Sequence, residues 1–475
     1  MPDEKVFVLD TNVLIQDPSA LEKLENDIMI PVSVIQELDK LKNDDIIGLS
    51  ARSASRQIEA YRATGFLKDG VSKGNDASLF VDSRKIDFGS FAFDLEDTHD
   101  NRIVLAALRW QSEHPGKRVV LKSNDLNVRI IASSIGVPAE EYQYERGIPV
   151  SDKLYSGTAK IELTEESSFD IFTELYQEGS VPDTVIFSAS SATPESLLPN
   201  QCCYLMRPDR SVALAIYQKA SGLFVAVDKP RERRAGAGIY PINNEQAFAY
   251  ALLSDQSKSL VTLRGKTGSG KTLMALAAAY AQTDPHGGLY EQILVFRPNI
   301  ELGQPLGHLP GTLDEKFWPW MQPIIDNFNL VIKRPQQAVA PDKGRGRRGG
   351  KKEQERIEEK SKPCTRFDDF REHGFIEISP INFMRGGTLH RRLIIVDEAQ
   401  NLTPHQIKSM ITRAGTGSKV VLTGDTEQID NRFLNATSNG LSYVIEKFKG
   451  QEMFGHITLE KTERSPLAEL AAQLL

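Results

Sequence analysis

A chain of 475 residues exceeds the roughly 250–300 residues at which one hydrophobic core stops growing, so we expect two or three domains rather than one. Hydrophobic residues make up 40% and charged residues 25% of the chain, which is typical of folded globular proteins and excludes wholesale disorder. With 57 basic and 64 acidic residues the formal net charge is −7, so any nucleic-acid site must be a local basic patch.

Cysteine content and hydropathy indicate the compartment. Three cysteines cannot form a disulfide framework, and they lack the paired spacing of zinc ligands. The opening segment MPDEKVFVLDTNVL has no basic region followed by a long apolar core, and no apolar run reaches the ~20 residues that cross a bilayer. We therefore expect a cytoplasmic protein with no membrane partner.

Short β-branched strands alternate with amphipathic helices over residues 1–145. Strands are predicted at residues 5–10 and 118–124, helices at 18–25, 101–114 and 126–136, and a strand followed by a helix at 27–41. This alternation predicts an α/β domain built on a parallel sheet.

The pattern changes near residue 146. Short alternating apolar and polar runs over 146–230 predict a small β-rich connector module, and the basic, glycine-containing residues 231–239 predict a linker. The α/β pattern returns over 240–475, interrupted by an insertion at about 334–363 without hydrophobic periodicity. Its sequence KGRGRRGGKK contacts nucleic-acid phosphates or is simply a solvated loop, and the sequence leaves both open.

The sharpest signal is GKTGSGKT, a full GxxxxGK[ST] pattern between a predicted strand and a predicted helix. Its residues are Gly265, Lys266, Thr267, Gly268, Ser269, Gly270, Lys271 and Thr272. The three glycines permit φ values that other residues resist, so that backbone N–H groups can close around a phosphate at a helix N-terminus. The lysine adds a cation, and the final hydroxyl can ligate Mg²⁺. The pattern predicts an ATP-binding site.

Two later strands deliver polar groups to the same sheet edge. The apolar run LIIV ends in Asp397 and Glu398, which we expect to hold Mg²⁺ through water and to polarise the attacking water, respectively. The alternative is a helix cap beside a surface charge. The strand SKVVLTG leads to Gln428, which we expect to sense the γ-phosphate rather than to belong to a polar turn.

Three further side chains have two interpretations each. Gln246 either contacts the adenine base or completes a capping box with Asn243. Arg297 and Arg464 are either arginine fingers that reach the γ-phosphate or ordinary surface or salt-bridged side chains. The sequence leaves these choices open.

Four acids fall at ends of predicted elements in the first 145 residues, namely Asp10, Glu37, Asp100 and Asp125. Such positions can converge at the carboxyl edge of a parallel sheet, where clustered oxygen ligands bind Mg²⁺ or Mn²⁺ and activate water for phosphodiester hydrolysis. The alternative is that the three aspartates are helix N-caps, which is the commoner use of such residues.

Four ordered motifs surround these acids: DTNVL from Asp10, VIQEL around Glu37, HDNRI around Asp100, and SND ending at Asp125. In this order they resemble the acidic motifs of PIN-domain ribonucleases, over residues 1 to about 145. The resemblance implies that the four acids are metal carboxylates and that Asn12 and Ser123 support them. It also suggests Asp97 as an additional or alternative ligand.

Residues 240–475 contain, beyond the phosphate loop, RP at 297–298, LGHLPG at 306–311 with Lys316, RG at 385–386, DEAQN at 397–401, GD at 424–425 and RSPL at 464–467. These motifs resemble those of the PhoH family of ATPases. Two positions depart from that family: its RGR ends here in Gly387, and its RHPL contains Ser465, so the roles of the second arginine and the histidine are not carried over. The whole chain looks like a bacterial PIN–PhoH fusion, a family regarded as coupling a helicase-like ATPase to a ribonuclease.

Too few residues follow Asp397 for a second RecA-like domain, so we expect a single motor core. Such a core moves along a strand only if a neighbouring subunit completes the cleft, which predicts a homo-oligomeric ring. The leading hypothesis is an ATP-driven motor that feeds single-stranded or structured RNA to a metal-dependent endoribonuclease. The alternative is an ATP-switched protein whose PIN-like domain binds RNA without cutting it.

Overall fold

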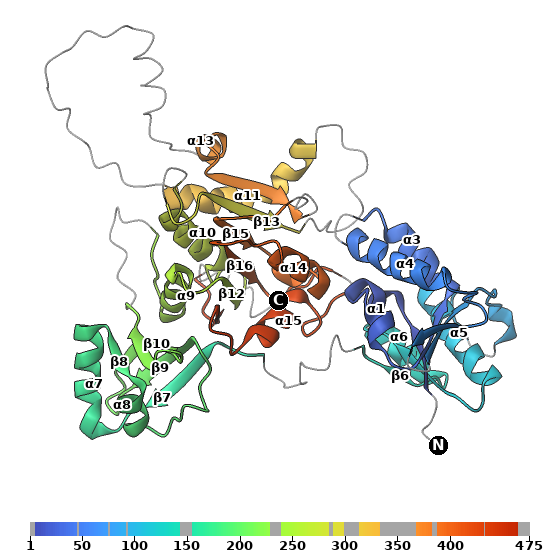
Figure 1. Cartoon of the computed structure of the whole chain (residues 1–475), viewed down its shortest axis with the longest axis horizontal. Coiled ribbons are helices and arrows are strands. Elements are labelled where there is room, and N and C mark those ends of the chain that lie inside the picture. Colours follow the sequence, from blue (N-terminus) through green and yellow to red (C-terminus); the bar gives the residue numbers. More distant parts are fainter. Residues whose placement is uncertain are drawn as a thin grey trace, which may run out of the picture.

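The computed structural model describes residues 5–44, 47–74, 77–91, 94–142, 154–228, 239–284, 288–298, 313–332, 367–381, 387–431 and 433–463. These residues form three sheets, one each in the N-terminal, middle and C-terminal parts of the chain. The N-terminal and middle parts lie on opposite sides of the C-terminal part (Figure 1). Within the described residues, no helix combines the length and apolar character that crossing a membrane requires.

The N-terminal sheet has the strand order β3-β4-β2-β1-β5-β6 and is parallel except for β3 against β4. Its strands are β1 (Lys5–Leu9), β2 (Asp27–Pro31), β3 (Val71–Gly74), β4 (Ala77–Asp82), β5 (Arg118–Lys122) and β6 (Ala139–Glu140). The helices are α1 (Thr11–Gln16), α2 (Ala20–Lys23), α3 (Val32–Leu41), α4 (Gly48–Arg62), α5 (His99–Glu113) and α6 (Leu126–Ser134), with a 3-10 turn at Phe88–Ser90. Continuous buried apolar runs in β1, β2 and β5 explain why these strands are parallel and central.

The middle part is a five-stranded sheet in the order β7-β9-β10-β11-β8, parallel only between β7 and β9. It contains β7 (Thr158–Glu162), α7 (Glu165–Glu178), β8 (Ser180–Pro182), α8 (Asp183–Ser188), β9 (Gln201–Met206), β10 (Val212–Gln218) and β11 (Leu223–Ala226). Cys203 packs in the same cluster as residues of α7 and α8, whereas the adjacent Cys202 packs in the core of the C-terminal domain. The sheet therefore buries both faces and joins the middle part firmly to the C-terminal domain.

The C-terminal sheet is wholly parallel, in the order β14-β13-β15-β16-β12-β17. Its strands are β12 (Leu260–Gly265), β13 (Gln292–Arg297), β14 (Ile376–Pro380), β15 (Arg392–Val396), β16 (Lys419–Gly424) and β17 (Phe454–Leu459). The helices are α9 (Asn244–Ser254), α10 (Lys271–Gln282), α11 (Leu313–Ile332), α13 (Phe367–Glu372), α14 (Pro404–Ile411) and α15 (Gly440–Phe448), with a 3-10 turn at Ala399–Asn401.

Alternate residues of β15 show that helices cover both faces of this sheet. Leu393 and Ile395 pack with residues of α9, α10 and α11, whereas Ile394 and Val396 pack with residues of α14 and α15. In such a doubly wound sheet, ligands bind outside the carboxyl ends of the strands. The phosphate loop after β12 and the acids after β15 both lie at that edge.

Candidate active sites

The phosphate loop connects β12 to α10, as its sequence predicts. Gly268 and Gly270 have φ values of +86° and +90°, a left-handed conformation that side chains disfavour. Gly265 is different: its φ is not positive, but a Cβ there would lie 2.3 Å from the Leu459 carbonyl oxygen of β17. The expectation about φ is thus wrong for this one glycine, and close strand packing explains it instead.

The cation of the loop is held in place by the loop itself. Lys271 Nζ donates to the carbonyl oxygens of Gly265 at 2.6 Å and Lys266 at 2.9 Å. A fixed ammonium group beside backbone N–H groups at the start of a helix is an anion site. The geometry suits the phosphates of a nucleotide.

Asp397 lies opposite this loop and is 5% exposed. Its Oδ1 accepts hydrogen bonds from Thr272 Oγ1 at 2.8 Å and Thr423 Oγ1 at 2.6 Å, so its side chain is not used as a helix cap. The hydroxyl and the carboxylate are adjacent hard oxygen donors, which fits Mg²⁺ beside a nucleotide phosphate.

Glu398 has a strained backbone, with φ of +54° and ψ of +40°. Its Oε1 lies 3.5 Å from Arg297 Nη2, and its Oε2 accepts from Gln400 Nε2 at 2.6 Å. Burial raises the pKa of Glu398, and the neighbouring Asp397 charge raises it further. A carboxylate with a raised pKa is suited to accept a proton from water.

Arg297 faces the acids of its own domain. Its Nη1 also lies 3.9 Å from Asp397 Oδ2, and its side chain lines the cavity beside the phosphate loop. Arg297 is therefore salt-bridged, as one interpretation predicts, but inside the candidate ATP site rather than on the open surface.

Gln428 is hydrogen-bonded to the phosphate loop. Its Oε1 accepts from Thr267 Oγ1 at 2.8 Å, and its carbonyl oxygen accepts from Gln400 Nε2 at 2.9 Å. Asp425 Oδ2 also accepts from Thr267 N, at 3.2 Å. The roles of Asp425 and Gln400 were not predicted, although Asp425 belongs to the GD motif and Gln400 to the DEAQN motif. A Cβ on Gly424 would lie 2.3 Å from Gln400 Oε1, which explains the glycine there.

Asn243 and Gln246 form only half of the predicted capping box, and the contact of Gln246 with the adenine base stays a prediction. Asn243 Oδ1 caps α9 through Gln246 N at 2.9 Å, but the return bond goes from Ile242 N to Gln246 Oε1 at 3.1 Å. Gln246 Nε2 donates to the Ser269 carbonyl of the phosphate loop at 3.0 Å. The side chain thus ties the start of α9 to the phosphate loop.

A cavity of about 590 Å³ joins these groups, large enough for a nucleotide. Tyr240, Ile242 and Gln246 line it together with Lys271 and residues of α11. The apolar and aromatic groups beside Gln246 suit a purine base, and the charged groups suit its phosphates.

The N-terminal domain buries Asp10, which is 3% exposed at the end of β1. Its Oδ2 accepts from Ser123 Oγ at 2.5 Å and Asn12 Nδ2 at 2.6 Å. The pKa of Asp10 is raised to about 7, mainly by burial and further by the charges of Asp100 and Glu37. The three acids therefore act on one another, and we call Asp10, Glu37 and Asp100 the acidic centre.

The helix-cap alternative holds for one of the three aspartates and fails for the other two. Asp10 occupies the N-cap position of α1 without a capping hydrogen bond, and Thr98 rather than Asp100 caps α5. Asp125 does cap α6, because its Oδ1 accepts from Asn127 N at 2.7 Å and Val128 N at 3.3 Å. Its carboxylate is turned to its own helix.

Divalent cations fit the acidic centre by donor chemistry. Carboxylates whose charges repel one another are stabilised by a shared Mg²⁺ or Mn²⁺, which accepts hard oxygen ligands. In the part of the chain that the structure describes, however, no three His, Cys, Asp or Glu side chains are grouped closely enough to enclose an ion. Glu37 Oε2 lies 3.6 Å from His99 Nε2 instead.

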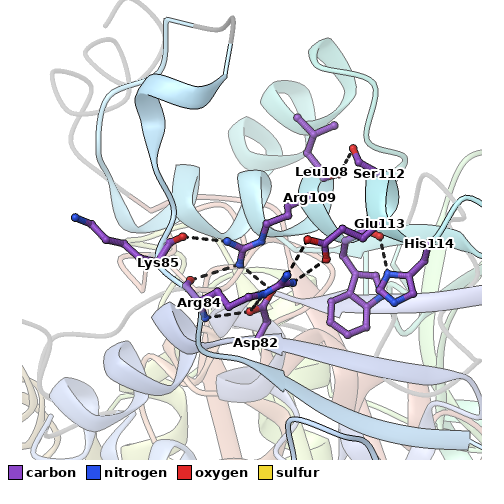
Figure 2. Close-up of polar contacts among 9 residues, drawn as sticks. Asp82, Arg84, Lys85, Leu108, Arg109, Ser112, Glu113 and His114 are labelled. Atoms are coloured by element: carbon purple, nitrogen blue, oxygen red, sulfur yellow. Dashed lines mark hydrogen bonds and ion pairs between the residues drawn. The ribbon is translucent and has the colours of Figure 1, made fainter.

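Two other acids of the N-terminal domain are held by arginines. Asp82, at the end of β4, is buried and pairs with Arg84 at 2.9 Å and Arg109 at 2.8 Å (Figure 2). Burial alone would raise its pKa, but these bonds outweigh burial and hold the pKa of Asp82 below its usual value. Asp97 is exposed and lies 2.6 Å from Arg102, so it pairs there rather than joining the acidic centre.

The buried carboxyl of Asp10 predicts a pH-dependent stability. Its pKa is raised from 3.8 to about 7, so the folded state loses stability as pH rises from about 4 to about 7. In EDTA, we expect Asp10→Asn to raise the free energy of unfolding relative to wild type, by a difference that grows by about 3 kcal/mol between pH 5 and pH 8. Thermal unfolding across this range tests it, and a difference independent of pH would contradict it.

Several predicted positions lie outside the described residues: Arg464 and the rest of RSPL, the KGRGRRGGKK segment, residues 306–311, Arg385 and Gly386. The side chain of Lys316 is also outside them.

Comparisons with known proteins match both ends of the chain. A family model described as "PhoH-like protein" matches residues 238–475, and a "PIN domain" model matches residues 7–143. "Protein PhoH2" of Bacillus subtilis is 36% identical over 99% of this chain and 100% of its own length. Proteins of the same name from Thermobispora bispora and Mycolicibacterium smegmatis are 32% and 30% identical, each over 99% of this chain and over 96% and 97% of their own lengths.

Proposed function

We propose, because the chain belongs to the PhoH family and carries an N-terminal PIN domain, that it is an ATP-driven enzyme that acts on RNA. In this proposal the PhoH domain is a helicase or translocase motor, and the PIN domain is a metal-dependent endoribonuclease. The observation that carries the proposal is that one chain holds both a candidate nucleotide site and the buried carboxyl of Asp10, whose pKa is raised beside two further acids.

ATP hydrolysis follows from the arrangement around the phosphate loop. Thr272 and Asp397 would hold Mg²⁺, which neutralises phosphate charge. Lys271 binds the β- and γ-phosphates, and Glu398 takes the proton of the attacking water. Gln428, bonded to Thr267 of the loop, is placed to sense the γ-phosphate.

RNA cleavage is assigned to the acidic centre. Asp10, Glu37 and Asp100 would bind Mg²⁺ or Mn²⁺, which activates water and stabilises the charge of the phosphodiester transition state. Ser123 and Asn12 orient the Asp10 carboxylate for this task through the bonds described above. We propose Asp125 as a further ligand once its carboxylate leaves the cap of α6.

A homo-oligomeric ring completes the proposal. The described C-terminal residues form one parallel sheet with one nucleotide cavity, so that a neighbouring subunit has to supply the second wall of a moving cleft. Arg297 lies in the cavity of its own chain, which leaves Arg464 as the candidate finger toward a neighbour.

One observation favours a second candidate function. Because the Asp125 carboxylate caps α6 in this structure, the PIN domain is also compatible with a protein that holds RNA without cutting it while ATP sets its conformation.

RNA-stimulated ATP turnover distinguishes the two candidates. We expect single-stranded RNA to raise the ATP hydrolysis rate several-fold, and labelled RNA to be cut when Mg²⁺ or Mn²⁺ is added but not in EDTA. A panel of RNA and DNA strands of matched sequence supplies the control for substrate class. ATP turnover that ignores RNA, together with intact RNA in both metals, would favour the switch.

A further inference from the structure

The segment that follows Gln428 contacts the N-terminal domain. Phe433 packs against the core of that domain. Asn435 Nδ2 donates to Glu141 Oε1 at 3.1 Å, and the Ser438 carbonyl accepts from Gln16 Nε2 at 3.0 Å. We call residues 433–438 the contact loop. Through Ser438, it bonds the side chain of Gln16 directly.

Asn435 and the adjacent Asn439 hold the contact loop in place. Asn435 Oδ1 accepts from Thr437 N at 3.0 Å and from Ser438 N at 2.8 Å. Asn439 Nδ2 donates to the carbonyl oxygens of Asn435 at 3.0 Å and Ala436 at 2.9 Å. A loop bonded in this way moves as a unit with the start of α15 rather than deforming locally.

A short chain of amides leads from Gln16 to the acidic centre. Gln16 is fully buried, and its Oε1 accepts from Asn124 Nδ2. Asn124 N donates to Asn12 Oδ1 at 3.0 Å, and Asn12 Nδ2 donates to Asp10 Oδ2 at 2.6 Å. Two asparagines therefore separate Gln16 from the carboxylate with the raised pKa.

The residues just before the contact loop are bonded to the turn that carries the acids of the ATP site. Asp430 N donates to Asn401 Oδ1 at 2.9 Å, and Asn431 Nδ2 donates to the Asn401 carbonyl at 3.1 Å. The adjacent Gln400 bonds both Glu398 and the Gln428 carbonyl. The residues that lead into the contact loop are thus bonded to Asn401 and are linked to Glu398 through Gln400.

We propose that Gln16 is a positioning residue of the acidic centre, and that the contact loop sets its position according to the nucleotide bound at the phosphate loop. This inference rests on the proposed function of both sites. A γ-phosphate competes for the Thr267 and Gln428 groups that now bond each other, which displaces the segment leading to the contact loop. Gln16 follows the Ser438 carbonyl and reorients Asn12 against Asp10. Because linkage is reciprocal, occupation of the acidic centre alters ATP affinity by the same factor.

Hydrogen exchange of the full-length protein tests the link without requiring RNA cleavage. Exchange of the amides in residues 10–16 and 123–128 is compared with ADP and with a non-hydrolysable ATP analogue, at constant Mg²⁺. We expect these amides to differ on the order of fivefold between the two nucleotides in wild type. The difference should vanish in Gln16→Met, which keeps the side-chain volume but breaks both hydrogen bonds.

Thr437→Ala is the matched control, because Thr437 is an exposed residue of the same loop and, among the described residues, its hydrogen bonds go to Asn435. It should retain the wild-type difference. If Gln16→Met fails to fold, Glu141→Ala removes the other polar contact from a partly exposed position and should at least halve the difference.

The inference is overturned if wild-type exchange in these segments is the same with both nucleotides, or if Gln16→Met or a folded Glu141→Ala keeps the full difference. A cleavage assay separates this outcome from failure of the proposed function. Wild-type protein that shows the exchange difference but cuts no RNA would refute the nuclease proposal and leave the link supported. In a protein that does cut RNA, Gln16→Met should lower kcat and abolish the ATP dependence of cleavage with KM for RNA unchanged, whereas a merely structural role would leave the ATP dependence intact.

Discussion

Replacing Lys271 with alanine should lower the ATP hydrolysis rate by at least about 100-fold. Its ammonium group is held by two carbonyl oxygens of the phosphate loop and is the cation placed to bind the β- and γ-phosphates. The alanine removes this charge without altering the glycines that shape the loop. Release of inorganic phosphate at saturating ATP measures the effect.

Lys266→Ala is the matched control for this variant. Lys266 belongs to the same loop, but its side chain is exposed and lies 3.8 Å from Glu427. We expect its ATP hydrolysis rate to stay within a few-fold of wild type. Equal losses in both variants would show that loop charge in general, rather than Lys271, supports hydrolysis.

Asp10→Asn should lower the rate of metal-dependent RNA cleavage on the order of 100-fold or more. It should leave the rate of ATP hydrolysis unchanged. The asparagine has nearly the same shape and can keep the bonds from Ser123 and Asn12, but it lacks the charge that a divalent cation needs. Cleavage of a labelled single-stranded RNA in Mn²⁺ and ATP turnover on the same preparation measure the two effects.

Asp97→Asn provides the control in the same domain. It removes an exposed carboxylate that pairs with Arg102 outside the acidic centre, so cleavage should remain near the wild-type rate. Metal-dependent cleavage that survives in Asp10→Asn would show that the nuclease site lies elsewhere.

Patterns local in sequence predicted much of the fold. β1, β5 and β15 are buried on both faces of their sheets, which produces the continuous apolar runs from which they were predicted. Helix α4 was missed because its buried face includes Ala51 and Ala54, which are too small to produce a clear hydrophobic period. In the middle part, α7 and α8 were missed because the alternating strands around them dominated the pattern.

The candidate sites also contain features that a local pattern predicts and features that it does not. The phosphate loop was predictable because all its groups are contiguous. The bonds from Gln400 to Gln428 and from Asn12 to Asp10 depend on which side chains meet across the fold or at a turn, and residue spacing does not specify that. Asp125 shows most clearly what the sequence leaves undetermined. An aspartate at this position can cap the helix or bind a metal ion, and the two roles differ only in the orientation of its carboxylate.

The central claim, that ATP hydrolysis delivers RNA to the PIN domain, is tested most directly by cleavage of an RNA hairpin with a single-stranded tail. Its cleavage is measured with ATP and with a non-hydrolysable analogue. We predict that the duplex part is cut only with hydrolysable ATP, whereas a single strand of the same sequence is cut with either nucleotide. Equal cleavage of the duplex part with ATP and with the analogue would contradict the account.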